Sequence, residues 1–272
     1  MWLVGSFRMS PARGMELMVL LAVGSDKGSP GVTTTALTLA AVWPRRAVFA
    51  ELDPFGGDVA FRLRGPRGVP LSPRTGLLSL AAGIRGGARH EQVFEHTQRL
   101  DGGLEVLLGP PQAEEVSDLD GLWGPLGQLL AGIPGVDVIA DCGRLYSRTP
   151  VLDLLGYSGG VLLVTRPAID AVAHLRARVS TLGIQLRDHA PGGVPLYVGV
   201  ITRPRDDRSP REIDSVLRQA NAPASVIGRI AYDTQGAGML TGEWLGRLDK
   251  SLLVRSVREM AGKLATAVRV GG

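Results

Sequence analysis

Runs of apolar residues bounded by glycine and proline recur along the chain, with amphipathic stretches between them. Several runs are continuous and rich in β-branched residues, which is typical of strands buried on both faces by helices. The pattern predicts strands at Leu17–Gly24, Arg46–Glu51, Gly103–Leu108, Val136–Asp141, Gly160–Thr165, Leu196–Thr202 and Val226–Ile230. It predicts helices at Thr33–Val42, Leu77–Ala82, Leu119–Ala131, Ala168–Leu182, Pro210–Gln219 and Leu252–Val268. We therefore expect an α/β fold, a doubly wound and mostly parallel sheet with helices on both faces.

The domain organisation follows from the absence of repeats and linkers. No stretch divides residues 15–272, so we expect one domain there. Residues 1–14 read as a flexible N-terminal extension, and Met9 and Met15 are alternatives to Met1 as the start of the protein.

Composition narrows the function classes. The formal charge is +4 and comes from scattered arginines, which an arginine-rich genome explains as well as a binding surface does. The densest basic clusters are short, so nucleic acid is not expected as the primary partner. The single cysteine, Cys142, excludes an intramolecular disulfide and fits a reducing cytoplasm. No apolar run approaches the roughly 20 residues that a membrane span needs, and we expect a cytoplasmic protein.

The first strand runs into a glycine-rich segment, Gly24–Thr35, and a helix follows at once. In such a turn the backbone N–H groups point inward and the helix dipole favours an anion, so phosphate is the natural ligand. Hydroxyls at the helix start add ligands for Mg²⁺. Taken alone, the segment is equally well interpreted as a strand-to-helix turn without a ligand.

The segment Lys27-Gly28-Ser29-Pro30-Gly31-Val32-Thr33-Thr34 resembles the deviant Walker A loop of the MinD/ParA family, Lys-Gly-Gly-x-Gly-Lys-Thr-Thr. The resemblance implies ATP and Mg²⁺ as cofactors in a P-loop NTPase-like fold. It implies that Lys27 is a catalytic residue that reaches the phosphates of a partner subunit, and that Thr33 binds Mg²⁺. The nucleotide-binding residues that it implies in this segment are Lys27, Gly28, Ser29, Gly31, Val32, Thr33 and Thr34.

Three positions depart from the family's loop. Val32 stands where the P-loop lysine belongs, Asp26 replaces the first glycine, and Ser29-Pro30 stiffens the loop. The lysine neutralises phosphate charge and supports the transition state, and valine does neither. Hydrolysis is therefore expected to be slow or absent.

Two more strand ends continue the resemblance. Glu51-Leu52-Asp53 resembles the family's Asp-x-Asp segment, which makes Asp53 the second candidate catalytic residue, placed near the attacking water. Asp141 ends an apolar strand, the Walker B arrangement, and joins Thr33 as the implied Mg²⁺ ligand. Thr202 and Arg203 stand where the family has Asn-Arg beside the adenine, and they complete the implied nucleotide-binding set.

An intact architecture with an altered loop most resembles the divergent CpaE/TadZ branch of pilus assembly loci. The resemblance covers about residues 15–268. It implies a homodimer that binds the protein partners of a larger assembly, for pilus or secretion machinery or for cell division and partitioning. Peripheral contact with the inner face of the membrane is a further expectation from the family, although Leu252–Val268 is better explained as a helix packed on the sheet. Two alternatives remain: an active chromosome- or plasmid-partitioning ATPase, and a scaffold that binds no nucleotide.

Overall fold

The computed structural model describes residues 18–28, 30–241 and 247–270, and within them eight strands form one sheet. The strands follow the order β3-β4-β2-β5-β1-β6-β7-β8, and every neighbouring pair is parallel except β3 and β4 at one edge. Their bounds are β1 Leu20–Ser25, β2 Ala47–Glu51, β3 Gln98–Arg99, β4 Glu105–Leu107, β5 Asp137–Arg144, β6 Gly160–Thr165, β7 Leu196–Thr202 and β8 Ala224–Ala231. The central strand β1 is flanked by β5 and β6 and is completely buried, which explains its unbroken apolar sequence.

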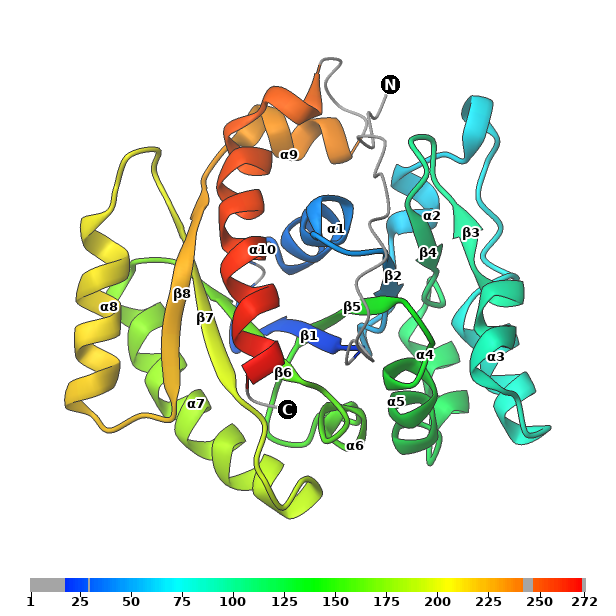
Figure 1. Cartoon of the computed structure of the whole chain (residues 1–272), viewed down its shortest axis with the longest axis horizontal. Helices are drawn as coiled ribbons and strands as arrows, with labels where there is room; N and C mark the ends of the chain where they lie inside the picture. The colour runs from blue at the N-terminus through cyan, green and yellow to red at the C-terminus, as the bar shows by residue number, and fades with distance from the viewer. Residues whose placement is uncertain (1–17, 29, 242–246, 271–272) are drawn as a thin grey trace.

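Helices cover both faces of the sheet (Figure 1). One face carries α1 Val32–Val42, α2 Val59–Arg62, α9 Thr234–Leu240 and α10 Leu252–Val270. The other carries α3 Leu77–Arg85, α4 Ala113–Val116, α5 Trp123–Ala131, α6 Leu152–Leu155, α7 Ile169–His189 and α8 Arg208–Gln219. Alternate residues of each strand point to opposite faces, so that Leu20 and Ala22 enter one apolar core while Leu21 and Val23 enter the other. The predicted doubly wound α/β fold is confirmed.

The last helix behaves as a core element. Its apolar side, from Leu253 through Val257 and Leu264 to Val268, is buried among side chains of α1 and the sheet. Figure 1 shows α10 lying beside α1 and alongside β8. The prediction of a helix packed on the sheet is confirmed. Among the described helices, none is long and apolar enough to cross a membrane.

Element boundaries follow the apolar pattern closely where strands are buried. β6 and β7 begin and end at the predicted residues, and the predicted helices are present with most ends shifted by at most four residues, although α7 continues to His189, beyond the predicted end at Leu182. Four short helices, α2, α4, α6 and α9, were not predicted, because four to seven residues are too few to show a helical period. The edge strand β3 was not predicted either, because two residues are too short to show an alternating pattern. The predicted extension at residues 1–14 lies outside the described residues.

Candidate functional site

The loop between β1 and α1 adopts a conformation that only glycine accepts readily. Gly28 and Gly31 have φ of 76° and 88°, in the left-handed region. A side chain on Gly28 would meet nothing within 4 Å, so open space lies over the loop. Gly31 is the N-cap of α1 and provides no side-chain cap, and the first turn has no acidic residue. The N-terminal N–H groups and the positive end of the dipole are therefore suited to an external anion. Ser29 lies outside the described residues.

The acidic residue of this loop is turned away from the open space. The Asp26 carboxylate accepts a hydrogen bond of 2.7 Å from Nε of Arg178 on α7, and Nδ1 of His174 lies 4.0 Å from its other oxygen. Asp26 therefore opposes a bound anion less than its position in the sequence predicts, because a guanidinium balances its charge. Lys27, the next residue, is exposed to solvent.

Val32 occupies the position of the missing lysine and is 5% exposed. It packs into the apolar core beneath α1, with only part of its surface facing the site. No positive charge enters the site from this position.

Asp141 lies at the centre of the site, near the end of β5, and is completely buried. Its Oδ1 accepts a hydrogen bond of 3.0 Å from the Gly143 N–H, while its Oδ2 is buried without a hydrogen-bond partner among the described residues. Burial raises the pKa of Asp141 to about 6, against the effect of the Thr33 hydroxyl beside it, which lowers the pKa. A buried carboxylate oxygen with no partner is costly unless a cation or a donor completes it.

Asp53 approaches the same place from the end of β2. Its Oδ1 accepts a hydrogen bond of 2.9 Å from the Phe55 N–H, and burial raises its pKa. Gly143 has φ of 55°, and a Cβ on it would lie 2.0 Å from Asp53 Oδ2. The absence of a side chain at Gly143 is what lets this carboxylate sit against β5.

Glu51 serves chiefly as a clamp between two loops. Its Oε1 accepts the Val59 N–H at 3.0 Å and its Oε2 accepts the Gly109 N–H at 3.1 Å. Gly57 closes over the carboxylate, since a Cβ there would lie 2.2 Å from the carboxyl carbon. Burial raises the pKa of Glu51 to about 7, which the two N–H donors oppose and the nearby charge of Asp141 reinforces. The clamp fixes the start of α2 relative to the ends of β2 and β4.

These groups surround one cavity of about 510 Å³ at the carboxyl edge of the sheet. Thr33, Asp53 and Asp141, which the sequence predicts to lie together, all line this cavity. The two loop glycines, Gly28 and Gly31, line it as well. It also contains two arginines that the sequence analysis did not assign to the site, Arg62 on α2 and Arg144 at the end of β5. The complete lining is Ser25, Gly28, Gly31, Val32, Thr33, Thr34, Glu51, Asp53, Phe55, Gly56, Asp58, Arg62, Asp141, Gly143 and Arg144.

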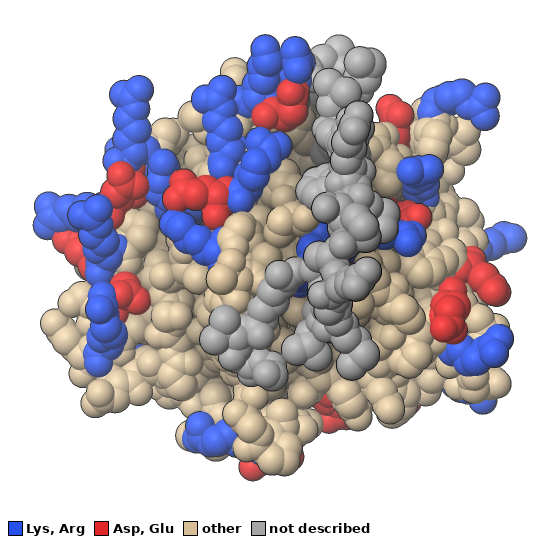
Figure 2. All heavy atoms as spheres, viewed as in Figure 1, with Lys and Arg blue, Asp and Glu red and all other residues tan. Residues whose placement is uncertain are grey.

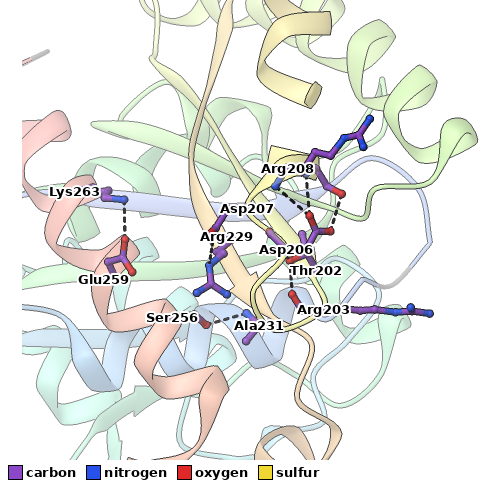
Figure 3. Close-up of polar contacts among 11 residues, drawn as sticks. Thr202, Arg203, Asp206, Asp207, Arg208, Arg229, Ala231, Ser256, Glu259 and Lys263 are labelled. Atoms are coloured by element: carbon purple, nitrogen blue, oxygen red, sulfur yellow. Dashed lines mark hydrogen bonds and ion pairs between the residues drawn. The ribbon is translucent and has the colours of Figure 1, made fainter. Parts of the chain in front are cut away.

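The predicted base-contact residues lie beside the loop but outside this lining. Figure 3 shows Thr202 held within its own turn, and Arg203 extending away from the other labelled residues. The Thr202 hydroxyl is buried and donates to the Arg203 carbonyl at 2.9 Å and to the Asp206 carbonyl at 3.3 Å. Their role at a base stays a prediction.

The residues present fit Mg²⁺ bound together with a polyphosphate. In the part of the chain that the structure describes, no group of three or more His, Cys, Asp or Glu side chains is arranged to hold a metal alone. Mg²⁺ is characteristically held by one or two carboxylates or hydroxyls, with water and substrate phosphate completing six ligands. The unpartnered Oδ2 of Asp141 beside the Thr33 hydroxyl matches that smaller requirement.

Solved structures with the same architecture include ATPases of the MinD and ParA kinds. The cell division ATPase MinD of Pyrococcus furiosus is 19% identical with a TM-score of 0.68, over 92% of this chain and 99% of that one. The ParA family ATPase of Chlorobium tepidum TLS is 15% identical with a TM-score of 0.68, over 90% and 98%. The chain has the fold of the MinD/ParA ATPases. No protein-family model and no curated protein matches the sequence.

Several solved structures with this fold contain a bound nucleotide. The septum site-determining protein MinD of Pyrococcus horikoshii OT3, complexed with Mg-ADP, is 15% identical, with a TM-score of 0.65 over 94% of this chain and 99% of that one. At this identity the likeness establishes the fold and leaves the ligand of this chain to be argued from its own residues.

Charges on the surface around α8 do not gather into a single basic patch. Figure 2 shows acidic side chains interleaved with basic ones over this side of the molecule. Arg208 pairs with Glu212, Arg229 with Asp207, and Arg218 with Asp214. These residues form local ion pairs, and the expectation that nucleic acid is not the primary partner stays a prediction.

Glu51 gives the protein a measurable pH dependence. Because its pKa is about 7 in the folded chain against an ordinary value of 4.5, the folded state prefers the protonated carboxyl. The resulting stabilisation is complete below about pH 4.5 and is lost as the pH rises through about 7. At about 1.36 kcal/mol per pKa unit, the loss from this group is about 3 kcal/mol.

Urea unfolding of the nucleotide-free protein between about pH 4.5 and pH 8 checks this expectation. We expect Glu51→Gln to flatten the fall in the free energy of unfolding, and Glu91→Gln, at an exposed position, to leave it unchanged. An equal pH slope for wild type and Glu51→Gln would contradict the buried, ionisable clamp.

Proposed function

We propose that this protein is a MinD/ParA-like ATPase-family protein that binds Mg-nucleotide and positions or assembles a larger cellular machine. The observation that carries the proposal is the meeting of an uncapped α1 N-terminus, Thr33 and the unpartnered Oδ2 of Asp141 in one cavity. An anion and a divalent cation satisfy these groups together, whereas either one alone leaves the other set unpaired.

The residues divide the work of binding between them. The backbone N–H groups of Gly28 and of Gly31 to Thr34 bind the phosphates, and Thr33 and Asp141 hold Mg²⁺. When bound, Mg²⁺ neutralises phosphate charge and fixes its orientation. The Asp53 carboxylate, held by the Phe55 N–H, orients a water molecule at the cavity wall.

Hydrolysis is weak or lost in this proposal because the charge that supports phosphoryl transfer is missing at position 32. Val32 is buried in the core, and Lys27 is exposed beyond the cavity lining. The nucleotide then acts as a ligand that stabilises one conformation or a homodimer. An exposed Lys27 is compatible with the family's contact from one subunit to the nucleotide of the other.

The proposed role is that of the divergent CpaE/TadZ-like branch, an assembly factor for pilus or secretion machinery. Its support is the combination of a complete MinD/ParA fold with a valine at the lysine position. Structures with the same fold include a cell division ATPase and a septum site-determining protein, so a role in division or partitioning belongs to the same proposal.

Phosphate release in saturating Mg-ATP tests the weak-hydrolysis claim. We expect wild type near background and Val32→Lys to gain at least about tenfold, because the new ammonium supplies the transition-state charge that wild type lacks. Val32→Met is the matched control, since it changes the size of the side chain without adding charge.

Two outcomes would replace this proposal. Turnover by wild type that Lys27→Ala abolishes would favour the active partitioning ATPase. No thermal shift with ATP or ADP would favour the scaffold that binds no nucleotide.

A further inference from the structure

The cavity beside α1 holds more negative than positive side chains. Four carboxylates line it, from Glu51, Asp53, Asp58 and Asp141, against two guanidinium groups. A polyphosphate adds more negative charge, and one Mg²⁺ offsets only two units of it. Because Val32 provides none, positive charge from side chains in this lining comes only from Arg62 and Arg144.

Arg144 is placed beside the phosphate loop by the sheet itself. Its backbone pairs with Ser25, the last residue of β1, where the parallel register shifts. The Nε donates a hydrogen bond of 3.1 Å to the Asp26 carbonyl, which holds the guanidinium against the loop. Within the described residues no carboxylate pairs with Arg144, so its charge is available to a ligand.

Arg62 on α2 is the second arginine in the cavity lining. It ends α2, whose first N–H is bound by the Glu51 clamp, and its charge lowers the pKa of the buried Asp141. Its present partner is Asp58, four residues earlier and more than half exposed. Exchange of that exposed pair for a phosphate costs little, because such pairs contribute only weakly to stability.

The loop's own acid does not cancel these charges. Asp26 is paired with Arg178 of α7 outside the cavity lining, so Arg144 contacts only its carbonyl oxygen. The Asp26 carboxylate is therefore engaged elsewhere, and the loop glycines and Arg144 line the same cavity.

We propose that Arg144 and Arg62 replace the missing loop lysine by binding the phosphates of the nucleotide in this cavity. This inference rests on the proposed nucleotide binding and names the residues of this chain that carry it. A guanidinium offers several N–H donors in a plane and matches phosphate oxygens in pairs, so two of them suit a polyphosphate.

Titration calorimetry with Mg-ATP tests the inference on wild type, Arg62→Gln, Arg144→Gln and the double variant. We expect each single change to weaken binding about tenfold and the double change about a hundredfold, the range for charged hydrogen bonds to phosphate. Arg144→Lys should keep most of the affinity, and Val32→Lys added to the double variant should restore part of it. Arg148→Gln, an exposed arginine outside the cavity lining, should bind like wild type.

The possible results distinguish failure of the arginine contacts from failure of nucleotide binding itself. Wild-type affinity in the double variant, with wild type itself binding, would overturn the role of the two arginines and leave nucleotide binding intact. Absence of binding by wild type at millimolar Mg-ATP would remove the proposed function and this inference with it. The salt dependence of the affinity provides a second readout, and it should be shallower in the double variant than in wild type.

Discussion

Asp141→Asn should abolish Mg-dependent nucleotide binding and, at the same time, make the nucleotide-free protein more stable. The amide cannot supply the negative oxygen that Mg²⁺ requires, and we expect affinity for Mg-ATP to fall by about a hundredfold or more. The amide keeps an oxygen to accept the Gly143 N–H, and it removes a charge that is completely buried.

The sign of the stability effect follows from the pKa. Asp141 has a pKa of about 6 in the folded protein against an ordinary 3.8, so ionising it opposes folding at every pH above about 4. Removing that charge should raise the free energy of unfolding by about 3 kcal/mol at pH 8, with a smaller gain as the pH approaches 4. Urea unfolding and calorimetry on the same preparations measure both effects. A variant that is less stable at pH 8 and binds Mg-ATP like wild type would contradict the assignment on both counts.

Asp137→Ala should destabilise the fold by about 3–5 kcal/mol without touching the nucleotide site, because it leaves a mostly buried guanidinium unpaired. Asp137 begins β5 and is 1% exposed. Its carboxylate accepts the Val19 N–H at 3.0 Å, Nε1 of Trp43 at 2.5 Å and Nε of Arg45 at 2.5 Å. The group joins the starts of β1, β2 and β5 at the amino edge of the sheet, opposite the cavity.

The exposed pair between Lys263 and Glu259 provides the control for that prediction. Glu259→Ala should change the free energy of unfolding by less than about 1 kcal/mol, as is usual for surface ion pairs. Folded Asp137→Ala should keep wild-type affinity for Mg-ATP. A loss of less than about 1 kcal/mol on Asp137→Ala would show that the buried network contributes no more than a surface pair.

The core of the site was predictable because strand ends in a parallel sheet share an edge. Asp53 and Asp141 each follow an apolar run, and the glycine-rich loop follows another, so the sequence alone predicts that they lie together. Gly28 and Gly31 stand at two positions of the loop where the structure has a left-handed backbone, which glycine accepts readily. The roles of these residues came from the resemblance to the MinD/ParA loop and strand ends, and the topological rule explains why they meet.

Other parts depend on contacts that no local pattern contains. The partners of Glu51 are N–H groups at positions 59 and 109, which come together only when β2 and β4 pair. Arg62 lies on α2, a helix that the apolar pattern does not predict, and Arg144 lies three residues beyond the predicted end of its strand. Asp26 looks unfavourable for a phosphate loop until Arg178, 152 positions away, pairs with it.

Calorimetric titration of wild type and Asp141→Asn with Mg-ATP and Mg-ADP tests the central claim, that this cavity binds nucleotide through Thr33 and Asp141. We predict that each wild-type chain binds one nucleotide at millimolar concentration or below, only in the presence of Mg²⁺, and that Asp141→Asn does not. Wild type that binds neither nucleotide at millimolar concentration, or an Asp141→Asn variant that binds both as tightly as wild type, would contradict it.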